Sequence, residues 1–152
     1  MIQHLVRPNI RQLTPYASAR SEFKGQADVF LDANESPYDT GYNRYPDPLQ
    51  QTLKTALAQL KEVAPGQLFL GNGSDEVIDL LLRIFCEPRE DHIMILPPTY
   101  GMYKVSADIA NIAVKEVPLQ PGRFQPDVPA ILAKADAHSK LLFLCSPNNP
   151  TG

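Results

Sequence analysis

Short apolar segments alternate along this chain with segments of helical periodicity, and this alternation restricts the possible folds more than any other feature. Residues 92–96 and 140–145 are almost continuously apolar, without the polar residue at every second position that a half-exposed strand shows. Strands of this kind are buried on both faces, as in a parallel sheet that helices cover on both sides. The sequence therefore predicts an α/β fold with a three-layer αβα sheet.

The boundaries of the expected elements follow from periodicity and from capping residues. Apolar residues that recur every three or four positions predict helices over 48–64, 75–86, 100–110 and 128–137. Asp47 and Asp127 are the expected N-caps of the first and last of these helices. Short apolar runs predict strands over 29–31, 67–70, 92–96, 112–117 and 140–145.

Composition excludes several classes of partner. The 152 residues carry a formal net charge of −3, and 43% of them are hydrophobic, which is a globular balance. The slight acidity argues against nucleic acid or an anionic membrane surface as partner. No apolar run approaches the ~20 residues that cross a bilayer, and no signal-peptide pattern is present. Cys86 and Cys145 lie in apolar stretches, so we expect buried free thiols and a cytoplasmic protein.

Three turns follow predicted strands, at the edge of the sheet where open α/β folds bind ligands. The first turn, Gly71–Glu76, leads from a strand into a helix. Its glycines let a ligand approach the backbone, and the free N–H groups of the helix start attract an anion. The turn predicts a phosphate cradle, although an ordinary helix start capped by Ser74 would have the same residues.

The other two turns offer an aromatic ring and an amide. Pro97–Gly101 places Tyr100 where its ring could stack on a planar ligand. Cys145–Gly152 contains Asn149 in a turn that its proline and glycine hold rigid. A tyrosine at the edge of the core and a plain turn would explain each feature separately. Taken together, the three turns predict one site that contacts a phosphate, a ring and a polar substituent.

In this order and spacing, the turns resemble those of fold-type-I pyridoxal-phosphate-dependent aminotransferases. The motifs are Gly-Asn-Gly-Ser-Asp-Glu, Pro-Pro-Thr-Tyr-Gly-Met-Tyr and Ser-Pro-Asn-Asn-Pro-Thr-Gly. The segments Leu13–Tyr16, Leu31–Glu35 and Asn43–Asp47 are similar to those of the histidinol-phosphate aminotransferase subfamily. The likeness extends from about residue 7 to residue 152 and implies the N-terminal part of such an enzyme.

The resemblance implies how the chain is divided. Residues 1–47 would form an N-terminal arm with a small-domain and dimer-interface segment. Residues 48–152 would form the first part of the large domain, which binds the cofactor. The three-layer αβα sheet of a fold-type-I transferase would then be incomplete, with exposed sheet edges.

The resemblance also implies which residues bind pyridoxal 5'-phosphate. The backbone of Gly73, Ser74 and Asp75 would hold the cofactor phosphate. Tyr100 would stack on the pyridine ring, and Asn149 would hydrogen-bond the phenolic oxygen of that ring.

Three further roles rest on the resemblance. Tyr45 would reach across a homodimer interface to the cofactor phosphate of the neighbouring subunit, although a tyrosine before Pro46 could simply pack at a helix entry. Tyr16 and Asn34 would face the substrate. No metal site is expected.

The family's catalytic lysine is expected outside these 152 residues. That lysine forms a Schiff base with the cofactor and moves the proton between substrate and cofactor. It lies well after the Asn-Pro-Thr-Gly turn. Lys140 follows a serine, as the family lysine does, but it opens a strand and precedes that turn. We therefore expect no catalytic residue in this chain, and no transaminase activity from the chain alone.

The subfamily resemblance implies histidinol-phosphate aminotransferase, an enzyme of histidine biosynthesis. Its small-molecule substrates would be L-histidinol phosphate and 2-oxoglutarate, with glutamate as the returning amino donor. Threonine-phosphate decarboxylases of the same fold share these motifs and are the alternative within the fold. A non-catalytic module that binds a phosphate or a partner is the alternative from a different class.

Overall fold

The computed structural model describes residues 2–23 and 25–152, and the chain divides into two compact units. The larger unit comprises Met1–Leu13 and Gly71–Gly152, and the smaller one comprises Thr14–Leu70. The division at residues 47 and 48 stays a prediction.

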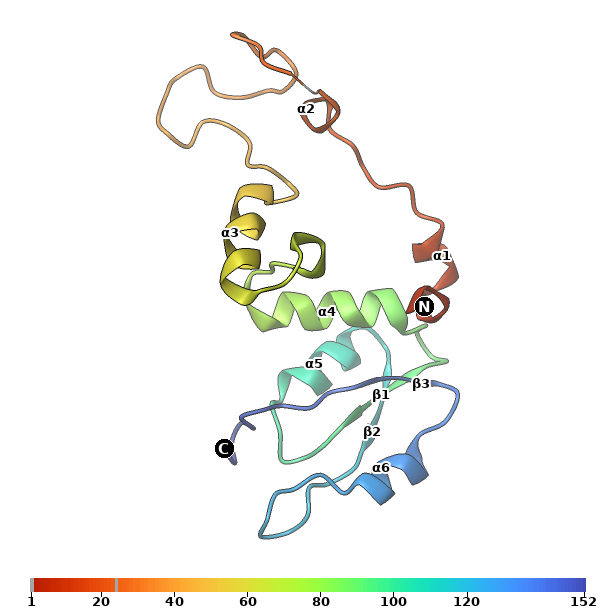
Figure 1. Cartoon of the computed structure of the whole chain (residues 1–152). Coiled ribbons are helices and arrows are strands. Elements are labelled where there is room, and N and C mark those ends of the chain that lie inside the picture. Colours follow the sequence, from red (N-terminus) through yellow and green to blue (C-terminus); the bar gives the residue numbers. More distant parts are fainter. Residues whose placement is uncertain (1, 24) are drawn as a thin grey trace. The chain divides into compact units, whose positions relative to one another are not determined.

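A three-stranded parallel sheet forms the centre of the larger unit (Figure 1). The strands are β1 (His92–Ile95), β2 (Ala113–Glu116) and β3 (Ser139–Leu142), and their order in the sheet is β2-β1-β3. The predicted parallel sheet is confirmed. β3 ends three residues earlier than predicted, although the N–H of Phe143 still donates to the carbonyl of Met94 over 3.0 Å.

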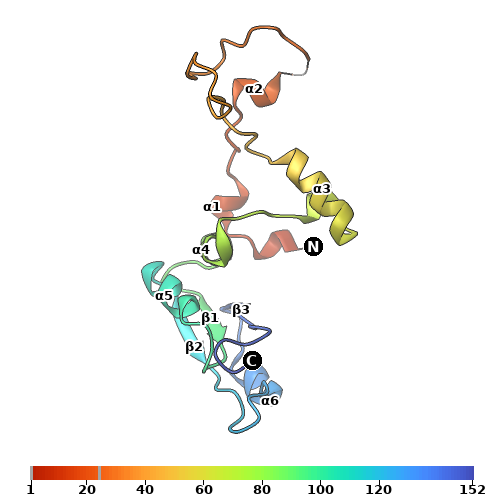
Figure 2. The same cartoon turned by 90° about the vertical axis from the view of Figure 1, so that its left-hand side faces the viewer.

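Helices cover both faces of this sheet (Figures 1 and 2). The side chains of β1 alternate between the faces, because successive strand residues point in opposite directions. Ile93 and Ile95 pack against helices on one face, whereas Met94 and Leu96 pack with Ile131 on the other. The helices are α4 (Gly73–Phe85) and α5 (Met102–Ile109) on the first face and α6 (Val128–Lys134) on the second.

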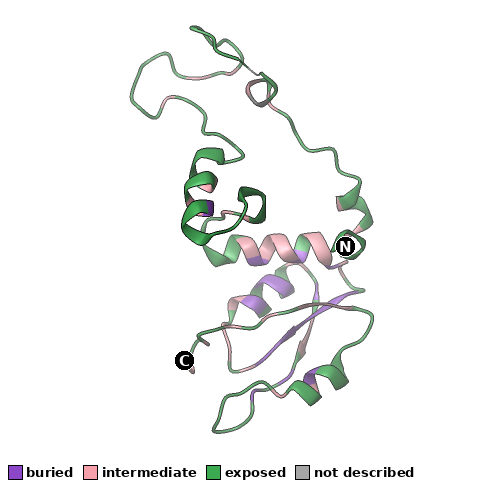
Figure 3. Cartoon of the chain, viewed as in Figure 1, coloured by how far each residue is buried: buried purple, intermediate pink, exposed green. Residues whose placement is uncertain are grey.

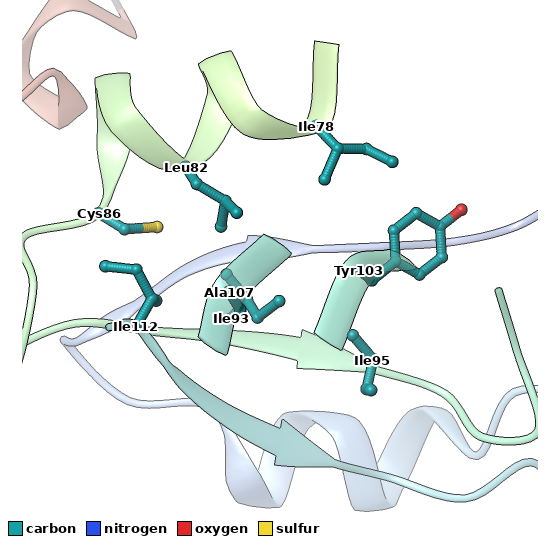
Figure 4. Close-up of a cluster of buried hydrophobic side chains, with 8 residues drawn as sticks. All are labelled: Ile78, Leu82, Cys86, Ile93, Ile95, Tyr103, Ala107 and Ile112. Carbon is teal, nitrogen blue, oxygen red and sulfur yellow. The ribbon is translucent and has the colours of Figure 1, made fainter. Parts of the chain in front are cut away.

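The larger hydrophobic cluster lies between α4, α5 and the sheet (Figure 4). Leu82 on α4 is fully buried there, and Cys86 beside it is 1% exposed. Burial raises the pKa of the Cys86 thiol to about 11, so this cysteine remains a neutral, apolar core residue at neutral pH. Cys145 is also a free thiol but is only half-buried, so the expectation of burial is wrong for it.

The N-terminal residues of the larger unit attach to the end of α4. They form a 3₁₀ helix, η1 (Ile2–Leu5), and a single helical turn, α1 (Pro8–Arg11). Arg7 between them makes a two-pronged ion pair with Glu87, with N···O distances of 2.8 and 3.0 Å. Its backbone N–H donates to the carbonyl of Ile84.

The smaller unit contains one long helix, α3 (Gln51–Lys61). It begins three residues later than predicted, because Gln50 takes a left-handed backbone conformation (φ 54°). Gln50 occupies the N-cap position, so the prediction that Asp47 is the N-cap is wrong. The Asp47 carboxylate still accepts hydrogen bonds from the N–H groups of Leu49 (2.9 Å) and Gln51 (2.8 Å). Most of α3 is exposed (Figure 3).

Two predicted strands, 29–31 and 67–70, are absent from the described part of the chain. A strand needs a neighbour for its backbone hydrogen bonds, and no described residue pairs with either segment. Residues 65–67 instead form a 3₁₀ helix, η2 (Pro65–Gln67), and the remaining short helix is α2 (Ala19–Glu22). Phe30 packs edge-on against Phe23, with ring centroids 6.1 Å apart.

No helix formed by the described residues is long and apolar enough to cross a membrane.

Candidate functional site

The first turn leaves the start of α4 exposed. Asn72 occupies the N-cap position, so the alternative interpretation of the turn, in which Ser74 caps the helix, is wrong, and Ser74 lies in the first helical turn. Both the backbone N–H and the side-chain amide of Asn72 donate to the Glu76 carboxylate. The helix can begin early because Gly73 takes φ +78°, a left-handed conformation that glycine adopts without a steric penalty.

This helix start has the properties of an anion site. The N–H groups of a first helical turn have no carbonyl one turn earlier, and the helix dipole places positive charge there. Residues 71–76 are all exposed. A Cβ built on Gly73 would meet no atom within 4 Å, so the space beside the backbone is open. The Glu76 carboxylate is held by Asn72, and that of Asp75 by a residue of the second turn.

Tyr100 links the second turn to the first. Its hydroxyl donates to Oδ1 of Asp75 over 3.1 Å. This hydrogen bond raises the pKa of Tyr100, so the hydroxyl keeps its proton to a higher pH than that of a free tyrosine. The Tyr100 ring packs edge-on against Tyr103, which in turn stacks on Phe143 with centroids 4.6 Å apart. Asp75 therefore holds the hydroxyl of Tyr100, and Tyr103 packs against its ring. The side chain lies near the carboxyl end of β1.

Asn148 links the third turn to the second. Its Oδ1 accepts from the hydroxyl of Thr99 (3.0 Å), and its Nδ2 donates to the carbonyl of Pro98 (2.9 Å). The same Nδ2 donates to the hydroxyl of Thr151 (2.7 Å) within its own turn. Asn149, the next residue, is exposed and makes no hydrogen bond with a described residue.

These contacts bring five of the predicted site residues into one region of the larger unit. The hydrogen bond of Asp75 with Tyr100 joins the first two turns, and the contacts of Asn148 join the last two. Gly73 and Ser74 precede Asp75, and Asn149 follows Asn148. Lys140 lies in β3 at the opposite edge of the sheet, with its ammonium 3.5 Å from Asp91. That Lys140 is not the catalytic lysine stays a prediction.

The other three predicted residues belong to the smaller unit, and the structure brings two of them together. The Tyr45 hydroxyl donates to the backbone carbonyl of Asn34 over 3.2 Å. Tyr16 is 92% exposed and makes no hydrogen bond with a described residue.

Glu35 holds the segment that carries Asn34 and Tyr45. Its side chain is 3% exposed and accepts from Arg44 (2.6 Å), from the N–H of Tyr45 (2.8 Å) and from Arg20 (3.3 Å). The guanidinium of Arg44, followed by the N–H of Tyr45, lowers the pKa of Glu35 to about 2. Roles for Glu35, Arg44 and Asn148 were not predicted from the sequence. Glu35 and Arg44 carry opposite charges and lie in two of the segments that resemble the subfamily, and this was the sequence signal that could have predicted their ion pair.

The order around Tyr45 is expected to depend on pH below about 4.5. A carboxylate whose pKa is lowered on folding stabilises the structure above its unfolded pKa, and this contribution is lost as the pH falls through the folded value. For Glu35 that window runs from about 4.5 down to about 2. We expect the amide resonance of Tyr45 to move with a midpoint near the lower end of this window in an NMR titration. Glu35→Gln should abolish the transition, and a transition that persists in this variant would contradict the assignment.

Comparison with known proteins identifies the family. Residues 21–152 match the family described as aminotransferase class I and II. The chain belongs to this family. A curated histidinol-phosphate aminotransferase from Bacteroides thetaiotaomicron is 56% identical over 152 residues, which are 99% of this chain and 44% of that relative. The chain thus spans less than half the length of this curated relative.

Solved aminotransferase structures confirm the fold-type-I fold. The putative histidinol-phosphate aminotransferase from Erwinia carotovora atroseptica has a TM-score of 0.64 and 29% identity, over 74% of this chain and 32% of that chain. The histidinol-phosphate aminotransferase from Sinorhizobium meliloti, in complex with pyridoxal-5'-phosphate, has a TM-score of 0.64 and 23% identity. That match covers 72% of this chain and 29% of the other. The chain therefore covers only part of the fold.

Proposed function

We propose that this chain forms part of a histidinol-phosphate aminotransferase, which transfers an amino group between L-histidinol phosphate and 2-oxoglutarate in histidine biosynthesis. The observation that carries the proposal is the hydrogen-bonded assembly of three turns at the carboxyl edge of the sheet. The 56% identity to a curated enzyme of this name supports the choice of substrates. Residues 1–47 are proposed as the arm and dimer-interface segment, and 48–152 as the first part of the large domain.

The start of α4 fits the phosphate of pyridoxal 5'-phosphate. We assign the phosphate to the backbone of Gly73, Ser74 and Asp75, which are exposed residues at the positive end of the helix dipole. The N–H of Gly73 donates to the carbonyl of Gly71 over 3.1 Å and would exchange this contact for the phosphate. The open space beside Gly73 allows a phosphate oxygen to approach the backbone closely. No side chain with a positive charge is required for this contact.

The second and third turns fit the ring of the same cofactor. Tyr100 would lie flat against the pyridine, and its hydrogen bond with Asp75 would keep the ring in place. Asn149 would donate from its exposed amide to the phenolic oxygen. When bound, the cofactor supplies an electron sink for bond-breaking at the substrate carbon that carries the amino group. The catalytic lysine is not assigned to any residue of this chain.

The smaller unit is proposed to act at the substrate and at a subunit interface. Tyr45 would contact the cofactor phosphate of the neighbouring subunit in a cytoplasmic homodimer, and Tyr16 and Asn34 would face the substrate. The contacts of Glu35 with Arg44 and with the N–H of Tyr45 would hold Tyr45 in position for this role.

An activity assay of the full-length gene product tests the proposal. With L-histidinol phosphate and 2-oxoglutarate we expect glutamate to form only when pyridoxal 5'-phosphate is present. Release of an amine and carbon dioxide from threonine phosphate, without glutamate formation, would instead indicate a decarboxylase. Phosphate binding with neither reaction would indicate a non-catalytic module.

The 152-residue chain alone serves as the matched comparison in the same assay. We expect no transaminase activity from it. After incubation with pyridoxal 5'-phosphate and borohydride, mass spectrometry should find no reduced adduct on one specific lysine. A stoichiometric adduct at a single position, abolished by replacing that lysine with arginine, would show that the chain holds its own catalytic lysine.

A further inference from the structure

We propose that Asn148 is a positioning residue, whose side-chain amide fixes the turn that carries Asn149 to the turn that carries Tyr100. The inference rests on the proposed function, because both residues through which Asn148 would act are proposed cofactor contacts. Asn148 itself would touch neither the cofactor nor the substrate.

The hydrogen bonds of Asn148 use the amide in a way that no other side chain of its size can. The carbonyl oxygen accepts from the hydroxyl of Thr99, while the nitrogen donates both to the carbonyl of Pro98 and to the hydroxyl of Thr151. An aspartate has no donor for the Pro98 carbonyl, and a leucine has neither donor nor acceptor. The half-buried position of Asn148 limits the water that could replace these contacts.

Asn148 also provides the connection between the two turns. Within the described part of the chain, its bonds to Pro98 and Thr99 are the only hydrogen bonds between residues 97–101 and 145–152. They join positions that lie 50 and 49 residues apart in the sequence. The direction of the Asn149 side chain therefore depends on a contact made by its neighbour.

The connection continues to the first turn. Tyr100 follows Thr99 directly, and its hydroxyl is bonded to Asp75 at the start of α4. The series of contacts thus runs from the proposed phosphate site, through the proposed ring contact, to the proposed amide contact. Loss of the Asn148 amide should detach the third turn from the second turn. The hydrogen bond between Asp75 and Tyr100 should remain.

Asn148→Asp tests this role in the full-length gene product. The substitution keeps the size of the side chain but places an acceptor against the carbonyl of Pro98. We expect the dissociation constant of pyridoxal 5'-phosphate to rise by about tenfold or more. We also expect the pH midpoint of the bound cofactor's visible absorbance to shift in the same direction as in Asn149→Ala. Ser146→Ala is the matched control, because Ser146 is exposed in the same turn and makes no hydrogen bond with a described residue. This control should stay within about twofold of the wild type.

Threonine variants separate the hydrogen bonds from a general effect on folding. Thr99→Val and Thr151→Val each remove one partner of Asn148, and each should weaken cofactor binding by about threefold to tenfold. Thr99→Ser and Thr151→Ser keep the hydroxyl groups and should restore binding to within about twofold. If Asn148→Asp fails to fold, these two pairs decide the question.

A double variant tests whether Asn148 acts through Asn149. In that case Asn148→Asp should add little to Asn149→Ala, because coupled positions are not additive. Fully additive effects of the two substitutions on the binding free energy of pyridoxal 5'-phosphate would overturn the inference. So would Asn148→Asp, Thr99→Val and Thr151→Val variants that bind the cofactor like the wild type. Either result would leave the proposed function standing. A folded wild-type protein that binds no pyridoxal 5'-phosphate would overturn both.

Discussion

Replacing Leu82 with alanine is expected to lower the opening free energy of the β1 amides by about 3 kcal/mol. Leu82 has no exposed surface and packs in the cluster between α4, α5 and the sheet (Figure 4). The shorter side chain loses apolar contacts and leaves a cavity, which closely packed helices on a sheet fill only in part. Native-state hydrogen exchange at residues 93–95 of the full-length gene product measures the change.

Leu132→Ala on α6 is the matched control for this experiment. Leu132 is 69% exposed, so its truncation should change the same opening free energy by no more than about 0.5 kcal/mol. Equal effects of the two substitutions would mean that Leu82 is not in the core. A faster exchange confined to α4, with β1 unchanged, would mean that helix and sheet do not open together.

Gly73→Val is expected to raise the dissociation constant of pyridoxal 5'-phosphate by about thirtyfold or more in the full-length gene product. Gly73 has φ +78°, and a β-branched residue held there costs on the order of 2 kcal/mol. The backbone will leave this conformation to relieve the strain. The first-turn N–H groups then no longer point at one position. A titration followed by the absorbance of the bound cofactor measures the effect.

Gly101→Val is the control for the bulk of the new side chain. Gly101 lies at the start of α5 with an ordinary φ of −65°, and a Cβ there meets no atom within 4 Å. We expect cofactor binding within about threefold of the wild type. If both valine variants bind equally weakly, the left-handed conformation of Gly73 is not the cause.

The part of the fold that could be predicted is the set of helices and strands with a strong apolar pattern. The strands around Ile93, Val114 and Leu141 were found within three residues of their ends. The strand around Ile93 is the central one and is buried along its whole length, because an uninterrupted apolar run has few alternatives to such a strand. The expectation of burial on both faces is wrong for β3, which lies beside β1 at the side of the sheet and is only partly buried. The crossovers between parallel strands place all three strand ends on one edge. The clustering of the second and third turns, which follow β1 and β3, was therefore also predictable. The first turn follows residues 67–70, which form no strand with a described residue.

The errors arose where the outcome depends on a partner or on one backbone angle. Segments 29–31 and 67–70 have the composition of strands, but the described residues provide no strand to pair with them. Helix α4 begins before Ser74 because of the left-handed Gly73, and α3 begins late because of the left-handed Gln50. A short segment of sequence does not show whether a distant strand will pair with it, and it only weakly favours one φ value for a single residue.

The sequence by itself determined the fold class, the three turns and the family, because each of these follows from patterns within short, contiguous segments. Only the tertiary structure decided how the turns are joined. The Asn148 contacts cross 49 and 50 residues, and the Tyr100 contact with Asp75 crosses 25. The Glu35 contacts with Arg20 and Arg44 likewise depend on how a loop folds back. Hydrogen bonds form between groups within about 3 Å of each other, and that proximity is decided by the folded chain.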